Sequence, residues 1–150
     1  MIVFAAPGTH AGVLTGPITN EANGHLYFLL TPSTWSAAEA EATSLGGHLV
    51  TMNDTNENHW VYTNFTAYDG VARALWIGLT DRRTSGGWEW VSGEPVTLTN
   101  YWISGQPNNA PTYGPQHWAM LWPVHDGVGL NERERWNDYW DVTTTMDQYA

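Results

Sequence analysis

The stretch Leu75-Trp76-Ile77-Gly78-Leu79 decides the fold expected for this chain. Its run of apolar residues predicts a strand. Gly78, inside that run, indicates a position where a second segment of backbone approaches closely. Because short strands and long loops follow this stretch whereas helical patterns precede it, the stretch marks the change between two parts of one domain.

Two helices are expected before this strand. Ser36 with Glu39, and Asp54 with Glu57, have the spacing of a capping box. The first helix should end at 46–47, where two glycines supply a left-handed stop, and the second near 68–70. Strands are expected at 2–6, 25–30, 48–52, 88–91, 118–122 and 135–139, with a linker over 8–17 and an irregular loop over 99–116. This order predicts the α+β class rather than a wound parallel sheet.

Composition excludes several classes of protein. The 150 residues, 42% of them hydrophobic, predict one globular domain, 1–150. A net charge of −10, with five arginines as the only basic residues apart from histidine, argues against nucleic-acid partners and favours cations or neutral polar ligands. Because the chain has no cysteine, disulfides and zinc–thiolate sites are excluded. No run approaches the ~18 apolar residues of a membrane span, so membrane insertion is not expected.

From about Gly24 to its end, the chain resembles a C-type lectin-like domain, of the cysteine-free kind found in bacterial surface proteins. The stretch 76–79 matches the family's most specific strand. Other matching stretches occur in the same order as in the family: 34–40, 46–50, 88–95, 105–109 and 136–138. The resemblance implies a C-type lectin-like fold, in which two helices flank small antiparallel sheets and one long irregular loop carries the ligand site.

The resemblance also implies a calcium site whose coordination shell is completed by sugar hydroxyls. Pro107, which is cis in sugar-binding relatives, would turn its two neighbours toward the ion. Trp102 would lie near the loop and could stack on a sugar ring. The implied metal ligands, which with Trp102 also form the ligand-binding set, are Gln106, Asn108, Gln116, Asn137 and Asp138.

One departure from the family weakens this site. Relatives have a glutamate where this chain has Gln116, which leaves Asp138 as the only carboxylate. Because calcium affinity follows ligand charge, the sequence predicts millimolar binding unless Asp126, Glu132 or Glu134 contributes. The Gln106-Pro107-Asn108 triplet combines the mannose-type and galactose-type family motifs and therefore predicts neither sugar class. Asn- and Pro-rich loops are also ordinary turns, and calcium-free domains of this fold bind proteins.

These observations predict a non-catalytic extracellular or cell-surface module. The partner is expected to be a glycan, bound through 99–116, or a surface protein. The alternative is a structural or adhesion module that uses the lectin-like fold for protein assembly, as a homo-oligomer or in tandem copies, without binding sugar. An enzyme is not expected, because acids alternating with arginines over 132–135 are typical of a solvated turn. No signal peptide is recognised in this chain.

The two ends of the chain suggest an unusual closure of the fold. Family domains close with an apolar strand, but here only Tyr149-Ala150 matches its start, and 2–6 resembles its other half. Residues 1–17 would then be a strand plus linker ahead of a core at about 24–150. The chain could be one period of a tandem array, a circular permutant closed by 2–6, or a donor of 2–6 to a neighbouring copy. Residues 2–6 could also simply form a first strand.

Overall fold

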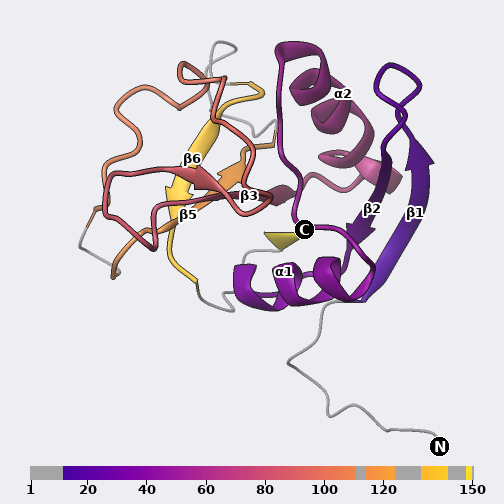
Figure 1. Ribbon diagram of the computed structural model, residues 1–150. Helices are drawn as coiled ribbons and strands as arrows, with labels where there is room; N and C mark the ends of the chain where they lie inside the picture. Colours follow the sequence, from indigo (N-terminus) through magenta and orange to yellow (C-terminus); the bar gives the residue numbers. More distant parts are fainter. Residues whose placement is uncertain (1–11, 111–113, 124–132, 142–147, 150) are drawn as a thin grey trace, which may run out of the picture.

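A computed structural model describes residues 12–110, 114–123, 133–141 and 148–149. A two-stranded hairpin and two helices form one side of the domain, and a sheet with long loops forms the other (Figure 1). The α+β class is therefore confirmed. In chain order the elements are β1 (Val13–Thr19), β2 (Leu26–Leu30), α1 (Trp35–Ser44), α2 (Thr55–Phe65), the 3-10 helix η1 (Tyr68–Gly70), β3 (Ala74–Thr80), β4 (Glu89–Trp90), β5 (Trp118–Leu121), β6 (Trp136–Tyr139) and β7 (Gln148–Tyr149).

Strand β3 is the centre of the larger sheet. The described strands run in the order β4-β3-β5-β6, with antiparallel pairing, and β7 pairs parallel to β3 at its start. Leu75, Ile77 and Leu79 belong to one apolar cluster. Trp76 belongs to a second cluster, because successive side chains of a strand point to opposite faces. The predicted strand at 75–79 is thus confirmed, and it is buried on both faces.

Gly78 lies at the close backbone approach that its position in the strand indicates. A Cβ atom at Gly78 would lie 2.6 Å from the carbonyl oxygen of Leu49. The amide of Gly78 donates to the carbonyl of Val50 at 2.9 Å, and its carbonyl accepts from the amide of Val91 at 2.8 Å. The segment that follows α1 therefore lies directly against the middle of β3.

Helix α1 begins two residues earlier than the capping pattern predicts. Thr34, which has an extended backbone, is the N-cap, and its hydroxyl accepts from the amide of Ala37 at 3.1 Å. Ser36 lies inside the first turn and donates to Asp141 instead. The carboxylate of Glu39 accepts from the amide of Leu49 at 2.9 Å, outside the helix. The predicted capping box is wrong here because a neighbouring hydroxyl occupies the capping position.

Helix α2 begins where the sequence predicts. Asp54 is its N-cap and accepts from the amides of Asn56 and Glu57 at 2.8 and 2.9 Å. The helix ends at Phe65, before the expected limit near 68–70, and η1 follows as a separate turn.

Two expectations about extended segments are wrong. Residues 13–17, expected to be part of a linker, belong to β1 because the edge of β2 supplies hydrogen-bond partners that the local composition does not reveal. Gly16 fits there because a Cβ atom would lie 2.7 Å from the carbonyl oxygen of Tyr27. Residues 48–52, expected to form a strand, do not form one: the carbonyl of Val50 accepts from Gly78 of β3, but the amide of Leu49 donates to the side chain of Glu39.

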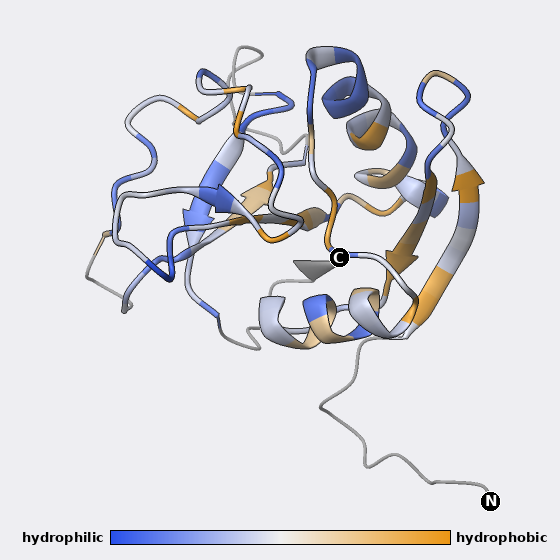
Figure 2. Ribbon diagram, in the orientation of Figure 1, coloured by the Kyte–Doolittle hydropathy of each residue, from blue (hydrophilic) through white to orange (hydrophobic). Residues whose placement is uncertain are grey.

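Strand β6 differs in chemistry from the strands beside it. Figure 2 shows β3 and β5 as apolar and β6 as largely hydrophilic. Yet Trp136, Asp138 and Tyr139 of β6 are buried. A polar strand in a buried sheet needs partners for its side chains, and the loop at 99–116 contacts this strand. Among the described residues, no helix is long and apolar enough to cross a membrane.

Candidate functional site

The loop at 99–116 is attached to the start of β6 by backbone hydrogen bonds. The amide of Trp136 donates to the carbonyl of Tyr101 at 2.7 Å, and the amide of Ile103 donates to the carbonyl of Trp136 at 2.8 Å. The Gln106-Pro107 peptide bond is cis, as in the sugar-binding relatives that the sequence resembles. The loop therefore reaches β6 directly before the predicted ligands Asn137 and Asp138.

Asp138 joins the loop to the sheet. Its side chain is fully buried, and Oδ2 accepts from the amides of Asn108 at 3.0 Å and Asn109 at 2.7 Å. Burial raises the pKa of the Asp138 carboxyl above its usual value, while these backbone hydrogen bonds oppose that rise. The nearby charge of Asp81 raises the pKa further. The carboxylate is therefore a buried charge in need of further compensation.

Three buried oxygen atoms in this region have no hydrogen-bond partner among the described residues. They are Gln106 Oε1, Asn137 Oδ1 and Asp138 Oδ1, and all belong to the predicted ligand set. Leaving a buried acceptor unpaired costs about 1–3 kcal/mol, so such groups are rare in a folded protein without a reason. A bound cation would supply one, because oxygen is the ligand that calcium prefers.

The other two predicted ligands already accept hydrogen bonds. Asn108 Oδ1 and Gln116 Oε1 both accept from the amide of Ala110, at 2.8 and 2.7 Å. Gln116 is buried, with 6% of its surface exposed, and its backbone amide donates to Asn109 Oδ1 at 2.8 Å. Asn109 has a left-handed backbone, φ 46°, which asparagine tolerates better than most residues. The turn at 108–110 thus brings Asn108, Gln116 and Asp138 together.

Trp102 lies at the base of the loop, partly buried. Its ring packs against Trp88 with centroids 4.7 Å apart and against Trp136 at 6.0 Å, both edge to face. This packing holds the loop against β6. The residue as a whole remains partly exposed.

Sequence reasoning missed the pairing of Asp81 with His117 beside the site. Asp81 is buried, and its Oδ1 lies 2.7 Å from His117 Nδ1, while Oδ2 accepts from the amide of Gly86 at 2.7 Å. An acid directly after an apolar strand was the signal that could have revealed it. Because Asp81 raises the pKa of Asp138, this pair shapes the electrostatics of the site.

The additional acids considered for the site contribute nothing that the structure describes. Asp126 and Glu132 lie outside the described residues. Glu134 pairs with His59, at 2.8 Å between Oε1 and Nδ1. Within the described ranges, no group of three His, Cys, Asp or Glu side chains could hold a metal, so a cation bound here would need amide oxygens in addition to the carboxylate of Asp138.

Known proteins resemble this chain in sequence and in structure. A family model described as "Lectin C-type domain" matches residues 31–142. The perlucin-like protein of Mytilus galloprovincialis is 30% identical over 106 residues, which cover 67% of this chain and 68% of that protein. Human C-type lectin domain family 4 member K is 36% identical over 87 residues, covering 56% of this chain and 25% of that protein. The solved structure of the C-type lectin CEL-I from Cucumaria echinata matches with a TM-score of 0.62 and 26% identity, covering 75% of this chain and 82% of that one.

These likenesses bear on three expectations. The structural match confirms the predicted fold, with two helices and small antiparallel sheets. The matched family consists of non-catalytic binding domains, which confirms that the chain is not an enzyme. The organisms named above are animals, so they lend no support to the expected bacterial surface-protein type.

Proposed function

Because the chain belongs to the C-type lectin domain family, we propose that it is an extracellular or cell-surface module that binds carbohydrate through the loop at 99–116. The human relative and CEL-I, both named as C-type lectins, support this assignment. The observation that carries it is the set of three unpaired, buried oxygen atoms on Gln106, Asn137 and Asp138. The chain spans about a quarter of that human relative, so further activities of such longer proteins are not assigned to it.

Calcium is the group that these residues fit best. Gln106, Asn137 and Asp138 would hold the ion, and it would offset the cost of their unpaired oxygens. When bound, calcium supplies coordination positions that hydroxyl groups of a sugar can fill. The protein's own part is to hold Asp138 in place through the amides of Asn108 and Asn109.

The affinity for calcium should be low. Asp138 is the only carboxylate in the set, and Asn108 and Gln116 would contribute oxygens that already accept from Ala110. Sites with few charged ligands in extracellular modules have dissociation constants of about 0.1–1 mM. The proposed site therefore responds to extracellular rather than cytosolic calcium concentrations.

The sugar should be neutral. With a net charge of −10, the protein repels anionic glycans except where a cation intervenes. Trp102, partly exposed at the base of the loop, is the proposed stacking partner. Since the triplet at 106–108 combines two family motifs, mannose and galactose must be compared directly.

A thermal melt tests the calcium site. At about 10 mM calcium and a dissociation constant near 1 mM, the melting temperature should rise by about 3–5 °C relative to chelator. Asp138→Asn should abolish the rise. Glu21→Gln, which also removes one negative charge but at an exposed position, should keep the rise in melting temperature. A calcium response that persists in Asp138→Asn would place the ion elsewhere.

Retention on immobilised mannose and galactose, with calcium and with chelator, tests the sugar site. Binding should require calcium and be lost in Asp138→Asn. Trp102→Phe should weaken binding less than Asp138→Asn does. If neither sugar is retained, calcium causes no shift, and the protein self-associates at micromolar concentration without calcium, the structural or adhesion role replaces this proposal.

A further inference from the structure

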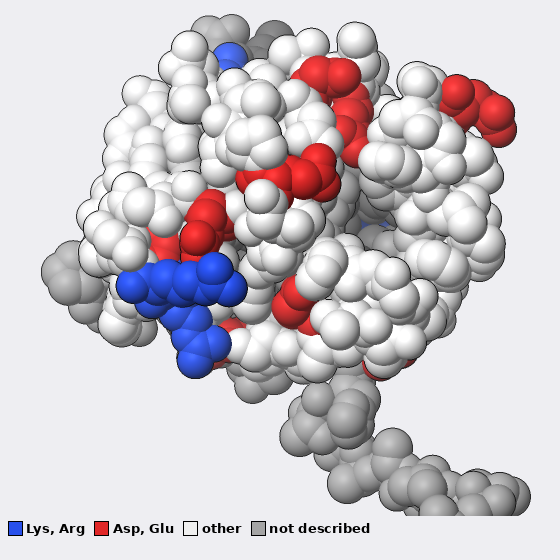
Figure 3. Space-filling view, in the orientation of Figure 1, with Lys and Arg blue, Asp and Glu red and all other residues white. Residues whose placement is uncertain are grey.

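A groove of about 520 Å³ opens between β2 and β3, away from the proposed sugar site. None of its lining residues belongs to the loop at 99–116 or to β6. Figure 3 shows the molecule hollowed beside the β1–β2 hairpin, with mainly uncharged atoms around the opening. The walls are residues 26–30 of β2 together with Ala42, Leu45, Val61, Phe65, Leu75 and Trp76.

One unpaired strand edge, that of β2, faces this groove. Among the described residues, β2 pairs with β1 alone, so its other edge has no strand beside it. On the opposite wall, β7 pairs with β3 at Ala74 and Leu75, and Leu75 already lines the groove. Beyond that pairing, the amide of Gly78 in β3 donates to the carbonyl of Val50, so of these two described strands β2 alone presents an unpaired edge. An unpaired strand edge is a template for another strand.

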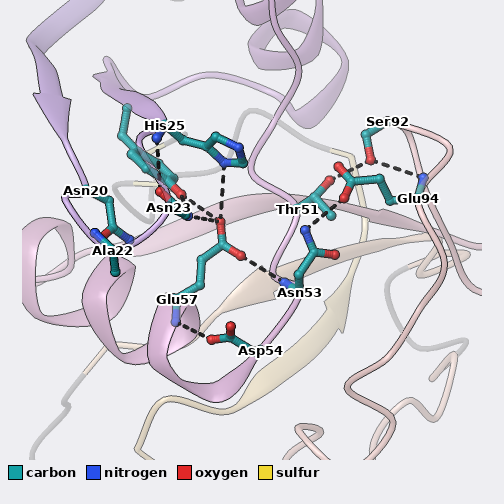
Figure 4. A network of polar contacts seen from close by, with 11 residues as sticks. Asn20, Ala22, Asn23, His25, Thr51, Asn53, Asp54, Glu57, Ser92 and Glu94 are labelled. Carbon is teal, nitrogen blue, oxygen red and sulfur yellow. Dashed lines mark hydrogen bonds and ion pairs between the residues drawn. The ribbon is translucent and has the colours of Figure 1, made fainter.

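Exposed apolar side chains line part of the groove. Leu26 is 60% exposed and Leu45 44%, which is unusual for leucine beside a cavity. Among its polar neighbours, Glu57 lies beside His25, Asn23 and Asn53 (Figure 4). The groove is also lined by His48, Thr51, Ser92 and Glu94. Glu57 is already satisfied by these neighbours, so it does not call for a charged ligand. The chemistry favours an extended apolar segment.

We propose that residues 2–6 of the same chain, Ile2-Val3-Phe4-Ala5-Ala6, fill this groove as a further strand beside β2. The segment is apolar, includes two β-branched residues and an aromatic one, and is followed by Pro7-Gly8, a turn signal. This inference does not depend on the proposed sugar site.

The described chain begins at one end of the groove. The amide of Gly12 donates to Thr31 Oγ1 at 2.8 Å, and the amide of Thr31 donates to the carbonyl of Gly12 at 2.7 Å. These bonds hold Gly12 beside Leu30, which lines the groove. The chain that leads to residues 2–6 therefore starts next to the site they would occupy.

The length of the connecting residues allows 2–6 to run in only one direction beside β2. From residue 6 to Gly12 the chain can span ~20 Å at most. Passing round the end of β2, from the groove to β1, requires about two strand spacings, or ~10 Å. Residues 2–6 would then run parallel to β2, with Ala6 near Leu30 and Ile2 near Leu26. The opposite direction needs a further ~17 Å to return along β2.

Engineered cysteine pairs test both position and direction, because the natural chain has no cysteine. Ile2→Cys or Val3→Cys, each combined with Leu26→Cys, should form an intramolecular disulfide under mild oxidation. Two positions are used because a shift of one residue changes which side chains meet. Ala6→Cys with Leu26→Cys is the matched control and should stay reduced. A disulfide that links two chains would show that a second copy fills the groove and would overturn the proposal.

Hydrogen exchange gives an independent measurement. Deleting residues 1–6 should accelerate exchange at the amides of β2 by tenfold or more, as expected when a pairing strand is removed. A peptide of residues 1–8, added at millimolar concentration, should restore protection. The substitutions Thr9→Ala and His10→Ala, in the connecting residues, should change little. Unchanged exchange after deletion, together with no disulfide from either pair, would overturn the proposal.

Discussion

The loop site lies on β6 and the groove lies beside β3, in the same sheet, yet each region lacks a different kind of partner. At the loop, three buried oxygen atoms have no hydrogen-bond partner among the described residues. At the groove, Leu26 and Leu45 expose apolar surface, while the buried carboxylate of Glu57 is fully satisfied. Unpaired oxygens favour a cation, and uncovered apolar surface favours another segment of protein.

This difference separates ligand binding from closure of the fold. A cation at the loop would bind only the folded state and respond to chelator. A strand in the groove would respond to truncation and not to calcium. Four substitutions break or sharpen this distinction, and they are given in order of decreasing expected effect.

Gly78→Val should damage both regions, because β3 lines the groove and is joined through β5 to β6, which carries Asn137 and Asp138. The new side chain would meet the carbonyl oxygen of Leu49, which is 2.6 Å from the position of a Cβ atom and is backbone that cannot move freely. We expect a loss of about 3 kcal/mol in the free energy of unfolding, measured in urea. Gly12→Ala, where the nearest atom is 3.8 Å away, should be tolerated. A stable Gly78→Val protein would contradict the close approach.

Glu57→Gln should weaken the groove and leave the loop intact. The two oxygens of Glu57 accept from the Tyr27 hydroxyl at 2.6 Å, from Asn23 Nδ2 at 3.1 Å and from the amide of Asn53 at 2.9 Å. A glutamine has only one acceptor atom, so we expect a loss of about 2 kcal/mol.

Glu94→Gln is the matched control for this substitution. Glu94 accepts from the side chain of Asn53 at 2.8 Å but is exposed, so its loss should be a few tenths of a kcal/mol. Both variants should keep the calcium-dependent rise in melting temperature. A lost rise in Glu57→Gln alone would mean that the two regions are coupled.

Stability should fall at alkaline pH through Tyr27. Burial raises the pKa of the Tyr27 phenol well above 10.0, and the hydrogen bond to Glu57 raises it further. As pH rises above about 10, the unfolded chain loses this proton while the folded protein keeps it. The free energy of unfolding therefore falls, by about 1.4 kcal/mol per pH unit.

Tyr27→Phe should reduce this alkaline slope, as measured by urea unfolding between pH 9 and 11. Part of the slope should remain, because burial also raises the pKa of Tyr62. An unchanged slope in Tyr27→Phe would show that other groups control the alkaline transition.

Asp138→Asn should have the smallest effect on stability when calcium is absent. An amide oxygen can still accept from the amides of Asn108 and Asn109, and the substitution removes the charge that burial disfavours. We expect a change within about 0.5 kcal/mol in chelator, measured by urea unfolding. A large loss in chelator would make Asp138 chiefly a structural residue.

The dependence of stability on pH in the acid range also follows from Asp138. Because the pKa of Asp138 is raised above 3.8, the unfolded chain ionises first as pH rises from that value. Stability in chelator should therefore decline slightly with rising pH through this window in the natural protein and not in Asp138→Asn.

Local patterns predicted the features that depend on neighbouring residues. Apolar residues around Gly78 identified the central strand, and Asp54 identified the start of α2. The same kind of evidence failed at Ser36, where a second hydroxyl two residues away takes the capping position. It also failed at 13–17, expected to be part of a linker, because the partner of β1 is a strand that the local sequence does not specify.

The sequence predicted only part of the candidate site, because local motifs do not show which distant segments meet. Motif resemblance identified the residues Gln106, Asn137 and Asp138, whose oxygens lack partners in the structure. It did not reveal that Gln116 already accepts from Ala110, nor that Asp81 lies close enough to affect Asp138. Those facts depend on contacts between segments distant in the chain.

By itself, the sequence determined the class of fold, the central strand and the residues of one family motif, because each rests on side chains within a few positions of one another. Tertiary structure alone decided which oxygens are left unpaired and which apolar surface is left uncovered. Asp138 meets Asn108 across thirty residues, and β2 faces β3 across more than forty. Hydrogen-bond pairing and burial are settled only when such segments meet, so the division between a ligand site and an open groove belongs to the folded protein.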